Sequence, residues 1–265
     1  FDEIAEWGED NLDFLRRYLP YHHGIPGARW LRILLNRINP ALFSACFESW
    51  ARSLRGGPPA QVAIDGKTSR GSHGRAGGRS ALHLVSAFAT SERLVIGQED
   101  IGQEGSEQET IPALIGRLAE GGGLKGALIT IDAIACNPTI ATAIADAGAS
   151  YVLAVKANQA TLLAELEAFF AATPPEELDI FIDADKGHGR VEERSTAVSR
   201  DVNWLDNGRS YPGAWRFPEL AAAARVLSRV FENGQERSQC RYFIASRPLG
   251  AKAMAEAVRS HWRIE

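Results

Sequence analysis

The sequence predicts a mixed α/β protein with a helical segment before an α/β core. Apolar residues recur at helical spacing before residue 55, and glycines and prolines occupy 56–59. Beyond them, short apolar runs of strand length alternate with amphipathic stretches of helical length. Because strands that alternate with helices build a sheet covered by helices, an all-α or all-β protein is disfavoured. A length of 265 residues allows one or two domains.

The N-terminal segment is expected to be a helical domain over residues 1–57. Residues 12–19 and 31–38 each carry a helical apolar stripe, and 41–54 predicts a further helix. Gly56-Gly57-Pro58-Pro59 then breaks the helical pattern and is the best candidate for a linker.

The second domain is expected over residues 60–265. Strands are predicted at 61–65, 82–89, 93–101, 127–132 and 151–156, and helices at 107–119, 138–147 and 161–170. A β-rich insertion is expected at about 175–247, with strands at 190–198, 225–232 and 241–246. Asn233-Gly234 predicts a hairpin within it, and residues 251–265 return to helix.

The composition excludes several classes of protein. Hydrophobic residues make up 45% and charged residues 23%, which excludes a disordered or collagenous chain. No apolar run reaches the ~18 residues of a membrane helix, so no membrane span is expected. Three scattered cysteines without a CxxC pair fit a reducing compartment, and we expect a cytoplasmic protein. No leader is visible, and the first and last residues, Phe1 and Glu265, suggest a piece of a longer chain.

The net charge of −4 argues weakly against a nucleic-acid binder, but the charge is unevenly distributed. Residues 61–80 and 225–247 are locally basic, whereas 160–185 carry acids and no Lys or Arg. Local basic patches are what a phosphate backbone meets. Ordinary solvated faces remain an alternative explanation of the pattern.

Two apolar strands each run into an aspartate, Asp65 after Ala63-Ile64 and Asp132 after Thr130-Ile131. Ligands of open α/β sheets bind at the carboxyl ends of the strands. Two neighbouring carboxylates repel each other unless a cation lies between them. The pair therefore suggests a divalent-metal site acting on phosphate, while an Asp at a strand end is also a common turn former or helix cap.

Other motifs give weaker indications. Gly66-Lys67-Thr68 is not a nucleotide-binding loop, because Gln61 stands where its first glycine is needed, and no GxGxxG occurs. Two glycine-spaced basic stretches, 71–79 and 186–192, could follow a phosphate backbone or be plain surface loops. Metal ligation by His188 is disfavoured.

Taken together, these residues resemble the insertion-sequence As-type transposases, also called H-repeat-associated proteins. The resemblance spans essentially the whole chain, and its segments fall in the family's order. It is carried by residues 63–68 (AIDGKT), 82–88 (LHLVSAF), 131–133 (IDA), 151–159 (YVLAVKANQ), 187–190 (GHGR) and 261–265 (HWRIE), with the N-terminal Leu19-Pro20 and Gly24-Ile25-Pro26.

The resemblance implies a ribonuclease-H-like fold, in which the β-rich insertion precedes the last helix, and a DDE carboxylate triad. Asp65, Asp132 and Glu265 match the triad and would be both catalytic residues and metal ligands, with Glu192 as the alternative third acid. The implied cofactor is Mg²⁺, with Mn²⁺ as a substitute. Candidate DNA contacts are the basic residues Lys67, Arg70, Lys156, His188, Arg190 and Arg263.

The implied function is metal-dependent DNA strand cleavage and transfer during transposition. The partners would be double-stranded DNA, both the terminal inverted repeats of the element and the target, and a second copy of the chain on that DNA. The alternative is a catalytically inactive or repurposed remnant that binds DNA. That alternative rests on departures from the family pattern, such as Asn137 in place of the usual Gln.

Overall fold

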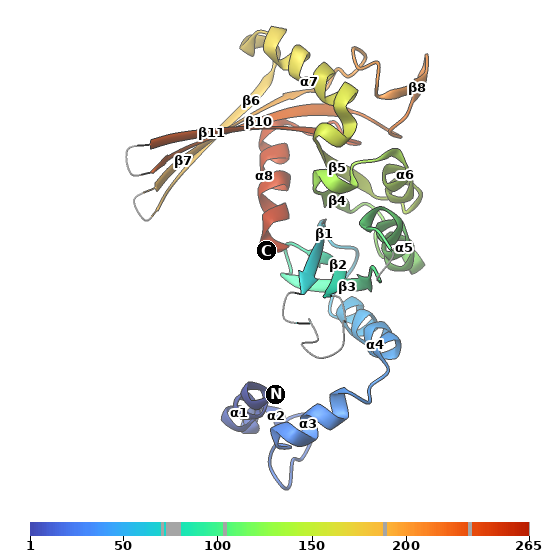
Figure 1. The fold of residues 1–265 in the computed structure, drawn as a ribbon, viewed down its shortest axis with the longest axis vertical. Coiled ribbons are helices and arrows are strands. Elements are labelled where there is room, and N and C mark those ends of the chain that lie inside the picture. The colour runs from blue at the N-terminus through green and yellow to red at the C-terminus, as the bar shows by residue number, and fades with distance from the viewer. Residues whose placement is uncertain (70–71, 73–80, 103–104, 188–189, 233–234, 265) are drawn as a thin grey trace. The chain divides into compact units, whose positions relative to one another are not determined.

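A mixed sheet is the scaffold of residues 51–265. The computed structural model describes residues 1–69, 72, 81–102, 105–187, 190–232 and 235–264. Within them, nine strands form this sheet in the order β3-β2-β1-β4-β5-β11-β10-β7-β6 (Figure 1). The strands are β1 Gln61–Ser69, β2 Leu82–Ala89, β3 Leu94–Asp100, β4 Leu128–Ile131, β5 Ser150–Val155, β6 Asp179–Gly187, β7 Arg190–Ser199, β10 Ala222–Glu232 and β11 Gln235–Ala245. The pairs β1–β4 and β4–β5 are parallel and the other neighbours antiparallel, which confirms the predicted mixed α/β class.

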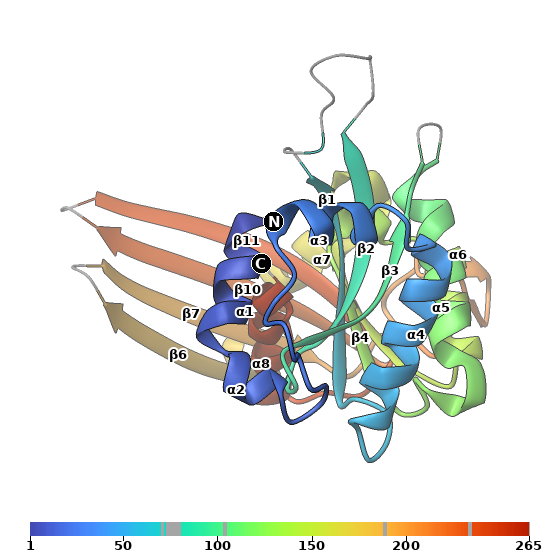
Figure 2. The same cartoon turned by 90° about the horizontal axis from the view of Figure 1, so that it is seen from below.

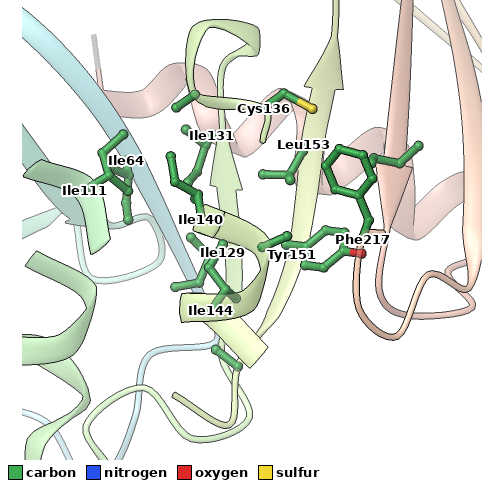
Figure 3. Close-up of a cluster of buried hydrophobic side chains, with 14 of the residues drawn as sticks. Ile64, Ile111, Ile129, Ile131, Cys136, Ile140, Ile144, Tyr151, Leu153 and Phe217 are labelled. Carbon is green, nitrogen blue, oxygen red and sulfur yellow. The ribbon is translucent and has the colours of Figure 1, made fainter. Parts of the chain in front are cut away.

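Helices cover both faces of the sheet (Figures 1 and 2). One face packs against α5 (Glu107–Ala119), α6 (Pro138–Asp146) and α7 (Ala160–Ala172), and the other against α8 (Ala251–His261). Isoleucines from β1, β4, α5 and α6 fill the first interface, as Figure 3 shows. All four residues of β4 are buried, as expected for a parallel strand covered on both sides.

The β-rich segment joins the same sheet. β11 pairs with β5, and the last partners are Tyr242 and Val155. Before Tyr242, β11 no longer pairs with β5, and it continues together with β10, β7 and β6 as a four-stranded extension of the sheet. We call this extension the arm. The arm comprises residues 181–187, 190–196, 226–232 and 235–241, which project past the carboxyl end of β5 (Figures 1 and 2).

The first fifty residues form a separate compact unit, Phe1–Trp50, distinct from Ala51–Glu265. Its helices are α1 Asp2–Asp10, α2 Leu12–Leu15, α3 Ala28–Leu35 and the start of α4 Pro40–Ser53. The residues around Gly8 pack tightly, because a Cβ there would meet the Ile25 side chain. None of the helices in the described part of the chain is both long and apolar enough to span a bilayer.

Three local features differ from the predictions. The first strand was expected to end at Asp65, but β1 continues to Ser69 because it stays paired with β2 up to Ser69–Leu82. β6 was not predicted, since acids at Asp179, Asp183 and Asp185 interrupt its apolar residues. A small hairpin of β8 (Arg209–Tyr211) and β9 (Ala214–Trp215) was also missed.

Candidate active site

Asp65 and Asp132 follow the last matched residues of two neighbouring parallel strands. β1 and β4 end their shared ladder at Ile64 and Ile131, and the aspartates come next on each strand. Adjacent strands lie about 4.8 Å apart, so the two acids stand side by side at the carboxyl edge of the sheet. The isoleucines before them are buried in the core, which fixes the strands that carry the acids (Figure 3).

Asp132 is held beside the lysine that directly follows β5. Lys156 Nζ lies 3.3 Å from each carboxylate oxygen of Asp132. Burial raises the pKa of Asp132, but the hydrogen bond from the Ala133 N–H and the positive charges of Lys156 and His261 outweigh it. The pKa of Asp132 therefore lies below its ordinary value, and the carboxylate is ionised at neutral pH.

A second lysine connects Asp65 to the end of the last helix. Lys67 Nζ lies 3.9 Å from Asp65 Oδ2 and donates a 3.0 Å hydrogen bond to the carbonyl oxygen of Ile264. Ile264 closes the short 3₁₀ turn Trp262–Ile264 that follows α8. The backbone directly before Glu265 is thereby held beside Lys67 and β1.

The last turn of α8 is also hydrogen-bonded to the sheet. Gln61 Nε2 donates to the carbonyl oxygen of Ala257 at 2.8 Å. Thr130 Oγ1 lies 3.0 Å from His261 Nδ1 and 3.4 Å from Gln61 Nε2. β1, β4 and α8 therefore meet in one polar cluster close to the two acids.

A pocket of about 400 Å³ opens beside Asp132. Its inner wall is apolar, formed by residues such as Val152, Ala154 and Phe243, whereas Asp132 and Lys156 contribute charge. On the side of the arm, the Arg241 guanidinium lies 4.9 Å from the centre of a Trp262 ring. The carboxylate edge thus adjoins a largely apolar cavity whose rim carries charged side chains of both signs.

Sequence comparison places the chain in a known family. The family model described as "Transposase DDE domain" matches residues 56–265, and the model described as "DDE_Tnp_1-associated" matches residues 1–51. The chain belongs to the DDE transposase family.

Named relatives agree with this assignment. "Putative protein YbfL" of Escherichia coli K12 is 36% identical over 100% of this chain and 70% of its own length. "H repeat-associated putative transposase YhhI" of the same strain is 35% identical, with the same coverage. "Putative transposase YncI" of Escherichia coli O157:H7 is 32% identical over 100% of this chain and 67% of its own length. These relatives confirm the resemblance seen in the sequence.

The transposase's predicted basic residues are only partly brought together. Lys67 and Lys156 flank the two aspartates, as described above. Arg263 lies in the turn after α8 and donates to the carbonyl oxygen of Thr90 at 3.5 Å. Arg70, His188 and the third predicted acid, Glu265, lie outside the described residues. Arg190 begins β7 on the arm, and its side chain also lies outside what the structure describes.

Glu192, the alternative third acid, lies on the arm. β7 is four strands from β4, which corresponds to about 19 Å across the sheet. Its carboxylate accepts a hydrogen bond from Ser228 and lies 2.7 Å from Arg194. This separation from Asp132 argues against Glu192 and favours an acid after Ile264.

The edge offers suitable ligands for a divalent cation. DDE transposase domains generally use one. Asp65 and Asp132 are hard oxygen donors one strand apart, and Mg²⁺ prefers one or two carboxylates completed by waters and phosphate oxygens. Among the described residues, no group of three or more His, Cys, Asp or Glu side chains could hold a metal. The aspartate pair fits a cation that a further ligand, such as Glu265 or the substrate phosphate, completes.

Two features of the site escaped the sequence analysis. Thr130 and His261 were part of the quoted motifs, but neither was predicted to contribute to the site. Gly66 was considered only as part of a phosphate loop, yet a Cβ at this position would overlap the Glu107 carboxylate. Glu107 in turn lies 3.2 Å from His83 Nε2. A glycine directly after Asp65 in a strand was the one feature of the sequence that indicated close packing of another side chain at this position.

Proposed function

We propose that this chain is the transposase of an insertion sequence and catalyses metal-dependent cleavage and transfer of DNA strands. The observation that carries the proposal is the placement of Asp65 and Asp132 side by side at the sheet edge in a member of the DDE transposase family. Asp65, Asp132 and Glu265 are the proposed catalytic acids and metal ligands. Mg²⁺ is the proposed cofactor, with Mn²⁺ able to replace it.

The proposed roles follow from charge and position. When bound, the metal ions supply Lewis acidity and lower the pKa of a bound water. Asp132 would hold a cation without first losing a proton, because its pKa is already depressed. Lys67 and Lys156 now face the acids, and they would turn to the phosphate once cations neutralise the carboxylates.

The proposed chemistry exchanges one oxygen substituent on the phosphorus of the scissile phosphate for another. The oxygen of water, or of a DNA 3′-hydroxyl in strand transfer, forms a new bond to phosphorus and gives its proton to solvent. The bond from phosphorus to the 3′-oxygen of the DNA breaks, and that oxygen takes up a proton from solvent to leave as a 3′-hydroxyl. No covalent bond to the protein is required.

The proposed fold is ribonuclease-H-like. It is supported by the five-strand order β3-β2-β1-β4-β5, with β1, β4 and β5 parallel, and by the last helix on the face opposite α5 and α6. We also propose residues 1–57 as the transposase-associated domain and 60–265 as the catalytic domain, with its insertion at 175–247. The two matched family segments and the two compact units support this division.

The proposed partners are the terminal inverted repeats of the element and the target DNA. Lys67, Arg70, Lys156, His188, Arg190 and Arg263 are proposed to contact phosphates, which position DNA without reading its sequence. A homodimer that joins the two element ends is also proposed.

A strand-nicking assay on element-end DNA tests the proposal. We expect cleavage with Mg²⁺ or Mn²⁺, none with EDTA, and none for Asp132→Ala in either metal. Asp146→Asn is the matched control, because Asp146 is an exposed acid at the end of α6 and should leave cleavage unchanged. Salt-sensitive DNA binding without cleavage in any metal would contradict the proposal and favour a DNA-binding remnant.

A further inference from the structure

Three polar side chains join the elements that carry the three proposed acids. Gln61 lies four residues before Asp65 on β1, Thr130 two residues before Asp132, and His261 four residues before Glu265. Thr130 Oγ1 is the centre of the cluster, 3.0 Å from His261 Nδ1 and 3.4 Å from Gln61 Nε2. Gln61 also donates to the carbonyl oxygen of Ala257, one turn before His261. Each acid is thus a few residues along the backbone from one member of the cluster.

The centre of the cluster is buried, and its other two members, Gln61 and His261, are partly buried. Thr130 is 2% exposed and Ala257 3% exposed. Buried polar groups depend on their hydrogen-bond partners, so the contacts hold one arrangement of α8 against β1 and β4. Nonpolar packing alone, through Met254 and Val258, would fix the helix less specifically, since apolar contacts are not directional.

We infer that the Gln61–Thr130–His261 cluster is a positioning device that holds the end of α8, up to the backbone of Ile264, beside the strands of Asp65 and Asp132 and so sets the metal-binding geometry of the site. This inference rests on the proposed function, because it assigns the cluster to the metal-binding geometry of the same site. Residues behind metal ligands tune affinity by fixing ligand orientation. Lys67 Nζ donates to the carbonyl oxygen of Ile264 and so also holds the turn after α8 beside β1.

A purely structural role makes a different prediction. If the cluster only stabilises the fold, its loss lowers the melting temperature and leaves the metal affinity of the folded protein unchanged. If it positions the acids, metal affinity falls while DNA binding without metal is kept. Metal affinity and DNA affinity therefore separate the two roles.

The test measures Mn²⁺ binding to the full chain by electron paramagnetic resonance, with no DNA present. Thr130→Val removes the hydroxyl and Thr130→Ser keeps it. Thr196→Val is the matched control, because Thr196 is a 1% exposed threonine on the same face of the sheet, in the arm. We expect Thr130→Val to weaken Mn²⁺ binding about tenfold, the lower end of the 10–100-fold range for such partners, with Thr130→Ser and Thr196→Val close to wild type.

A second pair of variants tests the imidazole and keeps the test usable if Thr130→Val does not fold. An asparagine amide reaches the position of Nδ1, whereas a glutamine amide reaches that of Nε2. His261→Asn should therefore retain more Mn²⁺ affinity than His261→Gln. DNA binding in EDTA should stay within about twofold of wild type for all variants, since phosphate contacts are untouched.

The outcomes distinguish this inference from the proposed function. Equal Mn²⁺ affinity of wild type, Thr130→Val and His261→Gln would overturn the positioning role. If wild type binds no Mn²⁺, or if Asp65→Ala and Asp132→Ala bind it as wild type does, the metal site itself is wrong and the proposed function fails with it.

Discussion

The carboxylate edge and the arm use the same charged residue types in different ways. Two acids of the arm, Asp183 and Asp185, accept hydrogen bonds at 2.7 and 2.8 Å from the terminal nitrogens of Arg259 on α8. On the arm itself, Arg194 lies 2.7 Å from Glu192. At the edge, the lysine nitrogens lie 3.3 Å from Asp132 and 3.9 Å from Asp65. The arm acids are thus engaged by close arginine contacts, whereas the edge acids meet looser point charges.

The two kinds of cation offer a carboxylate different geometry. A guanidinium fork can bind two carboxylates with a defined geometry. A lysine ammonium has no directional fork and can exchange for a metal ion. Acidic residues of similar appearance in the sequence therefore have a structural role on the arm and a proposed catalytic role at the edge.

The largest contrast is expected between Asp65→Asn and Asp183→Asn. Asp65→Asn should reduce DNA cleavage by more than about 100-fold, because even outer partners of a metal ligand cost 10–100-fold. Asp183→Asn loses a contact of Arg259 and should leave the cleavage rate within about twofold of wild type, since exposed ion pairs contribute little. Single-turnover cleavage of element-end DNA measures the rate of both variants. Equal losses of rate would contradict the different roles assigned to the acids at the edge and on the arm.

Lys156→Ala should reduce cleavage about tenfold, less than the 10²–10³-fold cost of removing a buried catalytic donor. Its ammonium is the nearest cation to Asp132, so its loss also raises the pKa of that carboxyl. Lys252→Ala, an exposed lysine in the first turn of α8, is the control and should cleave as wild type does. A normal rate for Lys156→Ala would remove this lysine from the site.

Gly66→Ala should destabilise the fold by about 1 kcal/mol, a typical single-substitution cost. The new methyl group displaces the Glu107 side chain and breaks its pair with His83. Thermal unfolding should show a fall of about 2–4 °C for a chain of this size. In Gly66→Ala/Glu107→Ala the cost of the glycine change should shrink, because the overlap is gone. Gly57→Ala, where a Cβ meets nothing within 4 Å, is the neutral control.

Arg259→Ala should lower stability by less than about 1 kcal/mol, because its partners are partly exposed and solvent screens the pair. Its effect on unfolding should weaken in high salt. Urea unfolding at low and high ionic strength measures this. A loss of metal-dependent cleavage without any loss of stability would show that the contact between Arg259 and the arm acids affects the site of Asp65 and Asp132.

The smallest expected effect is on acid stability. The folded-state pKa of Asp132 lies below its ordinary value of 3.8, so its contribution to stability is present above that value and is lost as the pH falls through the folded pKa. Asp132→Asn should therefore make the fall of melting temperature below about pH 4 shallower. An unchanged slope would mean that the Lys156 contact adds nothing to stability.

The sequence predicted the two aspartates of the site better than the polar side chains behind them. Ile-Asp after an apolar run placed Asp65 and Asp132 at the ends of two strands, because buried strands have a readable apolar pattern, whereas the pairing of the two strands is seen only in the structure. The cluster of Gln61, Thr130 and His261 was not predictable, since it joins residues about 70 and 130 positions apart. β6 was missed because its alternating acids are neutralised by Arg259, which lies more than 70 residues away in the sequence. Glu265 as the third acid stays a prediction.

Cleavage of the polypeptide by Fe²⁺ bound in place of Mg²⁺ tests the central claim most directly. With ascorbate and peroxide, the bound iron cuts the backbone next to its ligands, and mass spectrometry locates the cuts. The account predicts cuts near residues 65, 132 and 264, suppressed by excess Mg²⁺ and by Asp132→Asn. Cuts confined to the arm acids at 183, 185 and 192 would contradict it.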